Sequence, residues 1–180
     1  MTTARRSDRR TARDSARGPA RTGFLISQLG SLASARFGEL IKPTGLTPAT
    51  AGVLRILARE PGLSQRALAT RLGSAPSRVV VLVDSLEQAG LVSRSRDPED
   101  RRHHRLDVTD AGRQVLGTLR GAAETQNADL LAPLAPDERK AFAALVAKLA
   151  AGHGLDPDVH AGYREDGGSA GEGARDATGR

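Results

Sequence analysis

The feature that most constrains the fold of this 180-residue chain is a pair of short helical patterns separated by a tight break. Ser64 is suited to cap the first helix, which ends at Leu72, and Gly73-Ser74 forms the break. Ser74 can cap the second helix, and Pro76 falls in its first turn. That helix carries one apolar stripe at i, i+3, i+4 and i+7, formed by Val79, Leu82, Val83 and Leu86. One face of the second helix is therefore expected to be buried, which leaves the other for a partner.

The residues after this pair predict a small hairpin. Leu91 to Arg96 has the pattern of a strand, residues 97–100 have the composition of a turn, and Leu106 and Val108 alternate with polar residues. A helix, a tight turn, a second helix and a hairpin are the elements of a winged helix-turn-helix. In that arrangement the second helix can lie in the major groove of DNA, and the hairpin, or wing, reaches the neighbouring minor groove.

Longer helical patterns flank this unit on both sides. Apolar residues recur at roughly helical spacing from Phe24 to Ile41, and residues 42–45 end that helix. Thr47-Pro48 opens the next helix, and Thr109 can cap a long one. Pro136 opens a last helix. The expected fold class is mainly α with a small β wing.

The two ends of the chain lack a periodic apolar face. Residues 1–22 hold seven Arg and two Asp, and the last twenty residues are Gly-rich and mixed in charge. Such segments are expected to be disordered. The Arg-rich N-terminal segment has the composition of a flexible arm that could lie on DNA. A solubilising tail explains the same composition, and both interpretations stay open.

The charge distribution says more than the net charge of +6, because residues 60–110 hold eight basic and eight acidic side chains. On the second helix, the buried stripe leaves Ser77, Arg78 and Val81 outward near the N-terminal end. Arg78 could pair with a guanine edge or with a phosphate, and Val81 could touch a thymine methyl group. Ser77 and the helix N-terminus suit a phosphate. A solvated surface charge is the alternative for Arg78.

Five arginines fall within the twelve residues from Arg94 to Arg105. An arginine at the tip of a hairpin could enter a narrow minor groove, where the potential is most negative. Asp100 could fix the side chain of Arg102 by a bidentate pair. An ordinary charged loop, in which acids and bases cancel, explains the composition equally well.

Several of these residues match one signature. Leu86-Glu87-X-X-Gly90-Leu91-Val92 is followed by Asp100-X-Arg102 and by Val108-Thr109-X-X-Gly112. With these spacings, the chain resembles the MarR family (multiple antibiotic resistance regulators). The resemblance covers about residues 22–151 in element order and is strongest over 46–116.

The resemblance implies a homodimer that binds a palindromic operator in double-stranded DNA. Residues 24–41, 111–131 and 136–151 would interleave to form the dimer, so the fold class becomes a winged helix-turn-helix plus a helical dimerisation region. The helix from Pro76 to Ala89 would read the major groove. Arg102, steadied by Asp100, would enter the minor groove, and Asp84 would pair with Arg94.

The resemblance also implies a set of DNA-contacting residues on the two helices and the wing: Ser64, Gln65, Ser74, Pro76, Ser77, Arg78, Val81, Arg94, Arg96, Arg101, Arg102 and His103. Asp84 and Asp100 would orient the wing. Val80 and Val81 depart from the polar or basic residues that the family often has at these positions. Fewer direct hydrogen bonds to bases are then expected, so recognition would depend more on DNA shape and on phosphate contacts. Phe24 and Phe37 fall near the expected effector pocket and fit a core or a dimer interface equally well.

The expected organisation has five parts: an Arg-rich arm over residues 1–22, a dimerisation helix over 23–45, the DNA-binding domain over 46–110, dimerisation helices over 111–152 and a disordered tail over 153–180. Members of the family are mostly repressors, and many release DNA when a small aromatic or phenolic anion binds. We therefore expect a repressor of a nearby operon that a small anionic or aromatic effector releases. A DNA-binding regulator or architectural protein without an effector is the alternative.

Composition and spacing exclude several classes of function. The chain has no cysteine, which excludes disulfides and Cys-ligated zinc. Adjacent His103 and His104 on a strand point to opposite faces and make a poor chelating pair. No nucleophile–base–acid set and no phosphate-binding Gly loop appear. We expect no enzyme, no metal, no cofactor and no membrane span, and a cytoplasmic, nucleoid-associated location. A protein-interaction module that has lost DNA binding would not need Arg78 or the run from Asp100 to Arg102.

Overall fold

The computed structural model describes residues 20–96, 104–160 and 163. They fall into two compact units. One, the helical unit, lies within Met1–Pro48 and Thr118–Ala135. The other, the winged-helix unit, lies within Ala49–Gly117 and Pro136–Arg180. No helix of the described part is long and apolar enough to cross a membrane.

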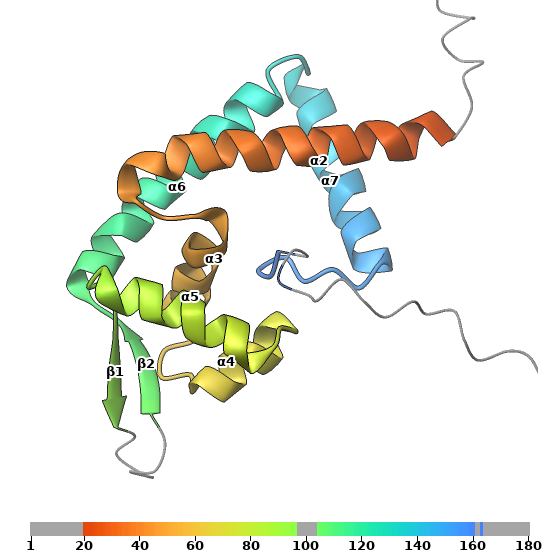
Figure 1. Cartoon of the computed structure of the whole chain (residues 1–180). Coiled ribbons are helices and arrows are strands. Elements are labelled where there is room, and N and C mark those ends of the chain that lie inside the picture. The colour runs from red at the N-terminus through yellow and green to blue at the C-terminus, as the bar shows by residue number, and fades with distance from the viewer. Residues whose placement is uncertain (1–19, 97–103, 161–162, 164–180) are drawn as a thin grey trace, which may run out of the picture. The chain divides into compact units, whose positions relative to one another are not determined.

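The helical unit consists of α2 (Ala20–Ile41), the short 3-10 helix η1 (Lys42–Thr44) and the C-terminal part of α6 (Asp110–Leu130) (Figure 1). Thr44 Oγ1 donates a hydrogen bond of 2.6 Å to the carbonyl of Ile41 where α2 ends. Gln126 Nε2 donates one of 2.6 Å to the carbonyl of Ala33, which connects α6 to α2. α2 begins at Ala20, inside the expected arm, and residues 1–19 of that arm lie outside the described residues.

The winged-helix unit contains α3 (Pro48–Arg59), α4 (Gln65–Leu72), α5 (Pro76–Gln88) and the strands β1 (Val92–Arg96) and β2 (His104–Val108) (Figure 1). The first turns of α6 and the helix α7 (Pro136–Gly152) belong to the same unit. The element order is the one predicted, and the structure confirms a mainly helical fold with one two-stranded sheet among the described residues.

A compact apolar core holds α3, α4 and α5 together. Its fully buried side chains come from all three helices and from the two strands: Val53, Leu54, Ile56, Leu57, Leu68, Leu72, Val79, Val83, Leu86, Val92 and Leu106. We call this set the α3–α5 core. Leu82, predicted as a fourth member of the stripe on α5, is only half-buried. The other three residues of the stripe are fully buried as predicted.

Two predicted helix caps are confirmed. Ser64 Oγ accepts a hydrogen bond of 3.1 Å from the backbone N–H of Ala67, and Thr109 Oγ1 accepts one of 3.1 Å from that of Gly112. Gly112 leaves no room for a side chain, because a Cβ there would overlap the carbonyl oxygen of Leu91 and the side chain of Val108. The first turn of α6 therefore packs directly against the start of the wing.

The predicted cap of α5 by Ser74 is wrong. The N-cap position is Ala75, which makes no side-chain capping bond. The backbone N–H of Ser74 donates to the carbonyl of Ala69 at 3.1 Å, so this residue belongs to the C-terminal cap of α4. Its hydroxyl is buried and has no hydrogen-bond partner among the described residues. Three residues, Gly73 to Ala75, separate the two helices, so Ser74 lies one position before the N-cap of α5.

The wing is an antiparallel pair in which Val92 faces Val108, Arg94 faces Leu106 and Arg96 faces His104. It is also attached to the loop before α4, because the backbone N–H of Leu106 donates to the carbonyl of Leu63 at 2.9 Å. The predicted turn over residues 97–100 lies outside the described residues. The hairpin thus has a fixed base on the helix-turn-helix.

Candidate nucleic-acid interface

The outward face of α5 combines a helix N-terminus with apolar side chains. Pro76, Ser77 and Arg78 are exposed in its first turn. Val81 is 67% exposed and Val80 is 39% exposed, although valine is usually buried. The face therefore offers backbone N–H groups and one arginine next to two methyl-bearing side chains.

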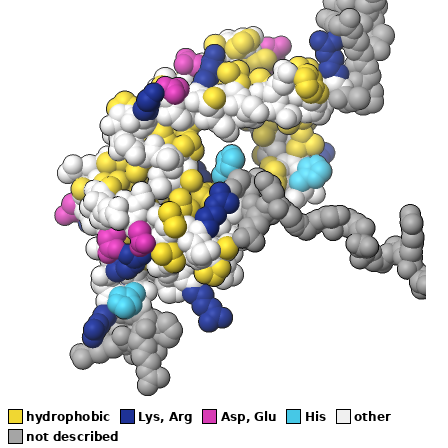
Figure 2. Space-filling view, in the orientation of Figure 1, with side chains coloured by type: hydrophobic (Ala, Val, Ile, Leu, Met, Phe, Trp, Pro, Cys, Tyr) yellow, Lys and Arg dark blue, Asp and Glu magenta, His cyan; other side chains and the backbone are white. Residues whose placement is uncertain are grey.

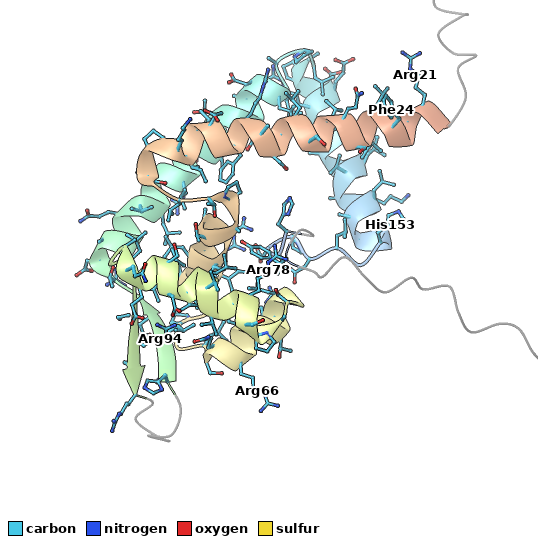
Figure 3. All side chains as sticks on the ribbon, viewed as in Figure 1. Arg21, Phe24, Arg66, Arg78, Arg94 and His153 are labelled. Carbon is cyan, nitrogen blue, oxygen red and sulfur yellow. The ribbon has the colours of Figure 1, made fainter. Side chains whose placement is uncertain are left out.

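Arg94 connects the wing to α5. Its guanidinium pairs with the carboxylates of Asp84 and Glu87, which lie three residues apart on one face of α5 (Figure 3). The amide oxygen of Gln65 on α4 lies 3.5 Å from Nη2. The hydrogen bond to Asp84 is the main reason why the pKa of Arg94 is raised. One arginine of β1 thus joins three elements of the motif.

The pair between Asp84 and Arg94, which the family resemblance implied, is present in the structure. Glu87 was missed, although its spacing of i+3 from Asp84 is a signal that sequence reasoning could have used. Arg94 is also one of the expected DNA contacts, and in the structure its side chain is 23% exposed and pairs with two carboxylates. Gln65 is half-buried and also faces Arg94 rather than solvent alone.

Two of the expected DNA-contacting residues, Ser64 and Ser74, do not present a free hydroxyl in the structure. The hydroxyl of Ser64 is engaged in the cap of α4. The hydroxyl of Ser74 is covered, so it presents no donor at the surface. Arg66, one residue into α4, is exposed and points away from the helix bundle (Figure 3), and sequence reasoning missed it. Its only sequence signal was its place two residues after the cap residue Ser64.

The described part of the wing presents Arg96, which is exposed at the end of β1. Arg105 on β2 is half-buried and lies over Gly62, where a Cβ would overlap its guanidinium. The expected wing-tip residues Asp100, Arg101, Arg102 and His103 lie outside the described residues. On the face that Figure 2 shows, arginines and lysines form separate patches, in agreement with the balanced charge of residues 60–110.

Phe24 and Phe37, the candidate pocket residues, both lie on α2. Thirteen residues of helix separate them by roughly 20 Å along the axis. Phe24 is 60% exposed and Phe37 is half-buried. One chain therefore does not bring the two rings into a common pocket.

Comparison with known proteins identifies this arrangement. A family model described as the MarR family matches residues 44–103. The chain is also 36% identical over 144 residues to a putative transcriptional regulatory protein for the hcr operon of Thauera aromatica, a match that covers 79% of this chain and 85% of that protein. The chain belongs to the MarR family.

Solved MarR-type structures have the same fold. The transcriptional repressor CouR bound to a 23-mer DNA duplex is 35% identical, with a TM-score of 0.62 over 71% of this chain and 91% of that one. CouR from Rhodococcus jostii RHA1 bound to p-coumaroyl-CoA is 30% identical, with a TM-score of 0.61 over 72% and 90%. As a MarR-family protein, the chain is a DNA-binding transcriptional regulator and not a member of an enzyme family, and regulators of this family act as dimers.

Proposed function

We propose that this MarR-family regulator represses transcription as a homodimer, with α5 of each protomer in a major groove and each wing in the adjoining minor groove. The observation that carries the proposal is the pairing of Arg94 with Asp84 and Glu87. These ion pairs, which we call the Arg94 junction, fix the direction of the wing relative to α5. A protein that binds two adjacent grooves of DNA needs that direction to be constant.

Within this proposal, the residues have three roles. Pro76 and Ser77 offer the N-terminus of α5 to a phosphate, Arg78 pairs with a phosphate or a guanine edge, and Val81 packs on a thymine methyl group. The wing adds its basic residues, which are the exposed Arg96 together with Arg101, Arg102 and His103. Arg94, Asp84, Gln65 and Asp100 position those groups, and Ser64 holds the start of α4. Arg66 joins the set as a further phosphate ligand.

The proposed dimer uses residues 23–45 and 111–152 around the DNA-binding domain over 46–110. Large apolar side chains on α2 and α7 are exposed in the single chain: Phe24, Leu25, Ile26, Leu29, Leu32, Phe142, Leu145, Val146 and Leu149. Exposed apolar area on this scale is uncommon on a monomer and typical of a protein interface. A second copy of the chain would cover these faces.

Release by a small aromatic or anionic effector is the part of the proposal that rests on a relative, since CouR is the protein solved with p-coumaroyl-CoA. The competing candidate is a regulator without an effector. The separation of Phe24 and Phe37 along α2 favours it, because one chain then offers no pair of rings for an aromatic ligand. In either case the protein works without a catalytic step or a cofactor, in the cytoplasm and on the nucleoid.

A binding titration tests the proposal. The ligand is a labelled duplex taken from the intergenic DNA upstream of the protein's own gene, measured by gel shift and anisotropy over a salt series. We expect a discrete complex that survives competitor DNA and an affinity that falls steeply with salt, by a slope of about 0.9 for each phosphate neutralised. Arg78→Ala should weaken binding, and Arg120→Ala, an exposed arginine of α6, should not.

A salt-independent affinity, or equal affinities for the two variants, would contradict the proposed interface. The effector is tested in the same assay by adding p-coumaroyl-CoA, with free coenzyme A as the control. Dissociation by p-coumaroyl-CoA alone supports release by an aromatic ligand. An unchanged complex supports the candidate without such an effector.

A further inference from the structure

The chain after α7 docks on the winged-helix unit, although the sequence predicted a disordered tail over residues 153–180. Three side chains of this stretch, Asp156, Asp158 and Tyr163, contact residues of α3 and α4. We call the described residues Asp156–His160 together with Tyr163 the C-terminal latch. Sequence patterns do not indicate these contacts, because the stretch has no periodic apolar face and is held by a few separate side chains.

The first contact is between Asp156 and Arg71. The guanidinium of Arg71 on α4 pairs with the carboxylate of Asp156 and, at 3.0 Å, with Glu60 at the end of α3. The other carboxylate oxygen of Asp156 accepts a bond of 2.8 Å from the backbone N–H of Asp158. The bond to Arg71, and then this backbone bond, lower the pKa of Asp156, so it stays ionised and paired near neutral pH.

The second contact joins Asp158 to two arginines one helical turn apart on α3. Its carboxylate pairs with Arg59, and its backbone carbonyl accepts a bond of 2.7 Å from Nη2 of Arg55. Together the two aspartates of the latch therefore engage three arginines of the winged-helix unit. Each pair is partly exposed and individually weak. Together, however, the two carboxylates reduce the net positive charge of the surface that these arginines form.

The third contact is the deepest. Tyr163 is 3% exposed, and its hydroxyl donates a hydrogen bond to the carbonyl of Ala49 in the first turn of α3. Gly52 makes this approach possible, because a Cβ there would overlap the hydroxyl and lie 3.1 Å from Cζ. Burial raises the pKa of Tyr163 to about 12, and the charges of Arg55 and Arg78 act in the opposite direction.

Arg78 connects the latch to the proposed DNA surface. It stands in the first turn of α5, and its charge acts on the phenol of Tyr163. Figure 3 shows its side chain beside the segment that follows α7. The phenol of Tyr163 is therefore close enough to the N-terminal end of α5 for the charge of Arg78 to act on it. The carboxylates of Asp156 and Asp158 thus lie beside arginines of the same unit that has to attract DNA.

We propose that the C-terminal latch is an autoinhibitory element that docks on α3 and α4 and competes with DNA for the positive charge of the winged-helix unit. The inference rests on the proposed DNA-binding function. When the latch is docked, Arg55, Arg59 and Arg71 are engaged by the chain itself. When it is released, these cations add to the potential that draws DNA phosphates to α5.

The test uses the full-length protein with Gly52→Ala, which removes the space for Tyr163 while alanine favours the helix. Gly121→Ala is the matched control, since it adds the same methyl group to helix α6 where no atom of the same chain lies within 4 Å, and light scattering checks that this variant keeps the oligomeric state of the wild type. Asp156→Asn combined with Asp158→Asn is a second variant, which removes both carboxylates and leaves α3 unchanged. All four proteins are measured in two assays.

The first assay is acrylamide quenching of tyrosine fluorescence, which reports on the latch alone because the chain has one tyrosine and no tryptophan. Quenching should be weak in the wild type and in Gly121→Ala, and several-fold stronger in Gly52→Ala. Strong quenching in the wild type would overturn the docking. The second assay is the affinity for the upstream intergenic duplex, which should rise about three- to tenfold in Gly52→Ala and in the double variant, with a steeper salt slope.

The outcomes separate the two proposals. If Gly52→Ala exposes Tyr163 and the affinity stays equal or falls, the latch is not autoinhibitory and the DNA-binding function stands. If quenching distinguishes the variants and neither the wild type nor any variant binds the duplex in a salt-dependent manner, the proposed interface fails, and the autoinhibition fails with it.

Discussion

The α3–α5 core and the helices α2 and α7 place their apolar side chains in opposite environments. Leu54 and Leu86 of the core are fully buried, whereas Phe24 on α2 and Leu145 on α7 are each 60% exposed. Among the described residues, α7 has no buried side chain. The core completes its apolar packing within one chain, and the two helices do not.

This difference shows which part of the molecule can be understood from a single chain. The elements around the core are held by contacts within one chain: Ser64 caps α4, Thr109 caps α6 and Arg94 joins β1 to α5. The exposed faces of α2 and α7 need a second copy to bury them. Stability of the core should therefore be independent of protein concentration, and stability of the helices should depend on it.

The largest effect that tests this comparison is expected from Leu86→Ala. The side chain is fully buried, so its truncation should lower the free energy of unfolding by about 2–5 kcal/mol at every protein concentration. Leu145→Ala is the matched change on an exposed position of α7. Its loss of stability should appear only where the wild type is a dimer. Urea denaturation of both variants at two concentrations measures this, and equal losses under all conditions would show that α7 is stable without a second copy.

Arg102→Ala comes next and tests the wing rather than the core. An arginine in the minor groove should contribute about 1–3 kcal/mol per half-site, and its loss should leave the dimer intact. Anisotropy with the upstream duplex gives the affinity, and light scattering gives the oligomeric state. Normal affinity in the variant would remove Arg102 from the interface. A monomeric variant would show that the substitution acts through the fold.

Arg94→Lys should have a smaller effect, on the order of 1 kcal/mol in DNA affinity, because an ammonium group can hold one carboxylate but lacks the planar geometry for Asp84 and Glu87 together. The unfolding free energy should change less than the DNA affinity, since all three side chains are partly exposed. Glu87→Gln serves as the partner variant. If both substitutions leave binding unchanged while the protein folds, the junction does not set the direction of the wing.

The sequence was most informative where structure depends on local pattern. Three of the four stripe residues of α5, the caps by Ser64 and Thr109, and the two strands of the hairpin follow from spacing over a few residues. The pair of Asp84 and Arg94 needed the family resemblance, because ten residues and a change of element separate the two side chains. Glu87 and Arg66 were missed since exposed charged residues carry little pattern of their own.

Tyr163 was beyond any local pattern, because its partners Ala49 and Gly52 lie more than 100 residues earlier in the chain. The predicted cap by Ser74 is wrong for a local reason: Ala75 takes the N-cap position of α5, and the backbone N–H of Ser74 bonds to Ala69 at the end of α4. Predictions from sequence therefore hold where one helix or turn determines the outcome. They fail where two segments compete for one residue or meet from a distance.

The smallest effect expected in the working range of pH concerns Tyr163. A buried phenol with a pKa of about 12, above its ordinary value of 10, stabilises the docked latch fully below pH 10, and this contribution is lost as pH rises from 10 through 12. Docking should thus be independent of this group between pH 6 and 9. Absorbance at 295 nm follows the single phenol directly. In Gly52→Ala, where Tyr163 cannot approach α3, the same titration should fall near 10. A wild-type titration near 10 would mean that the latch is not docked in solution. The C-terminal segment would then resemble α2 and α7, which do not complete their packing within one chain, rather than the α3–α5 core.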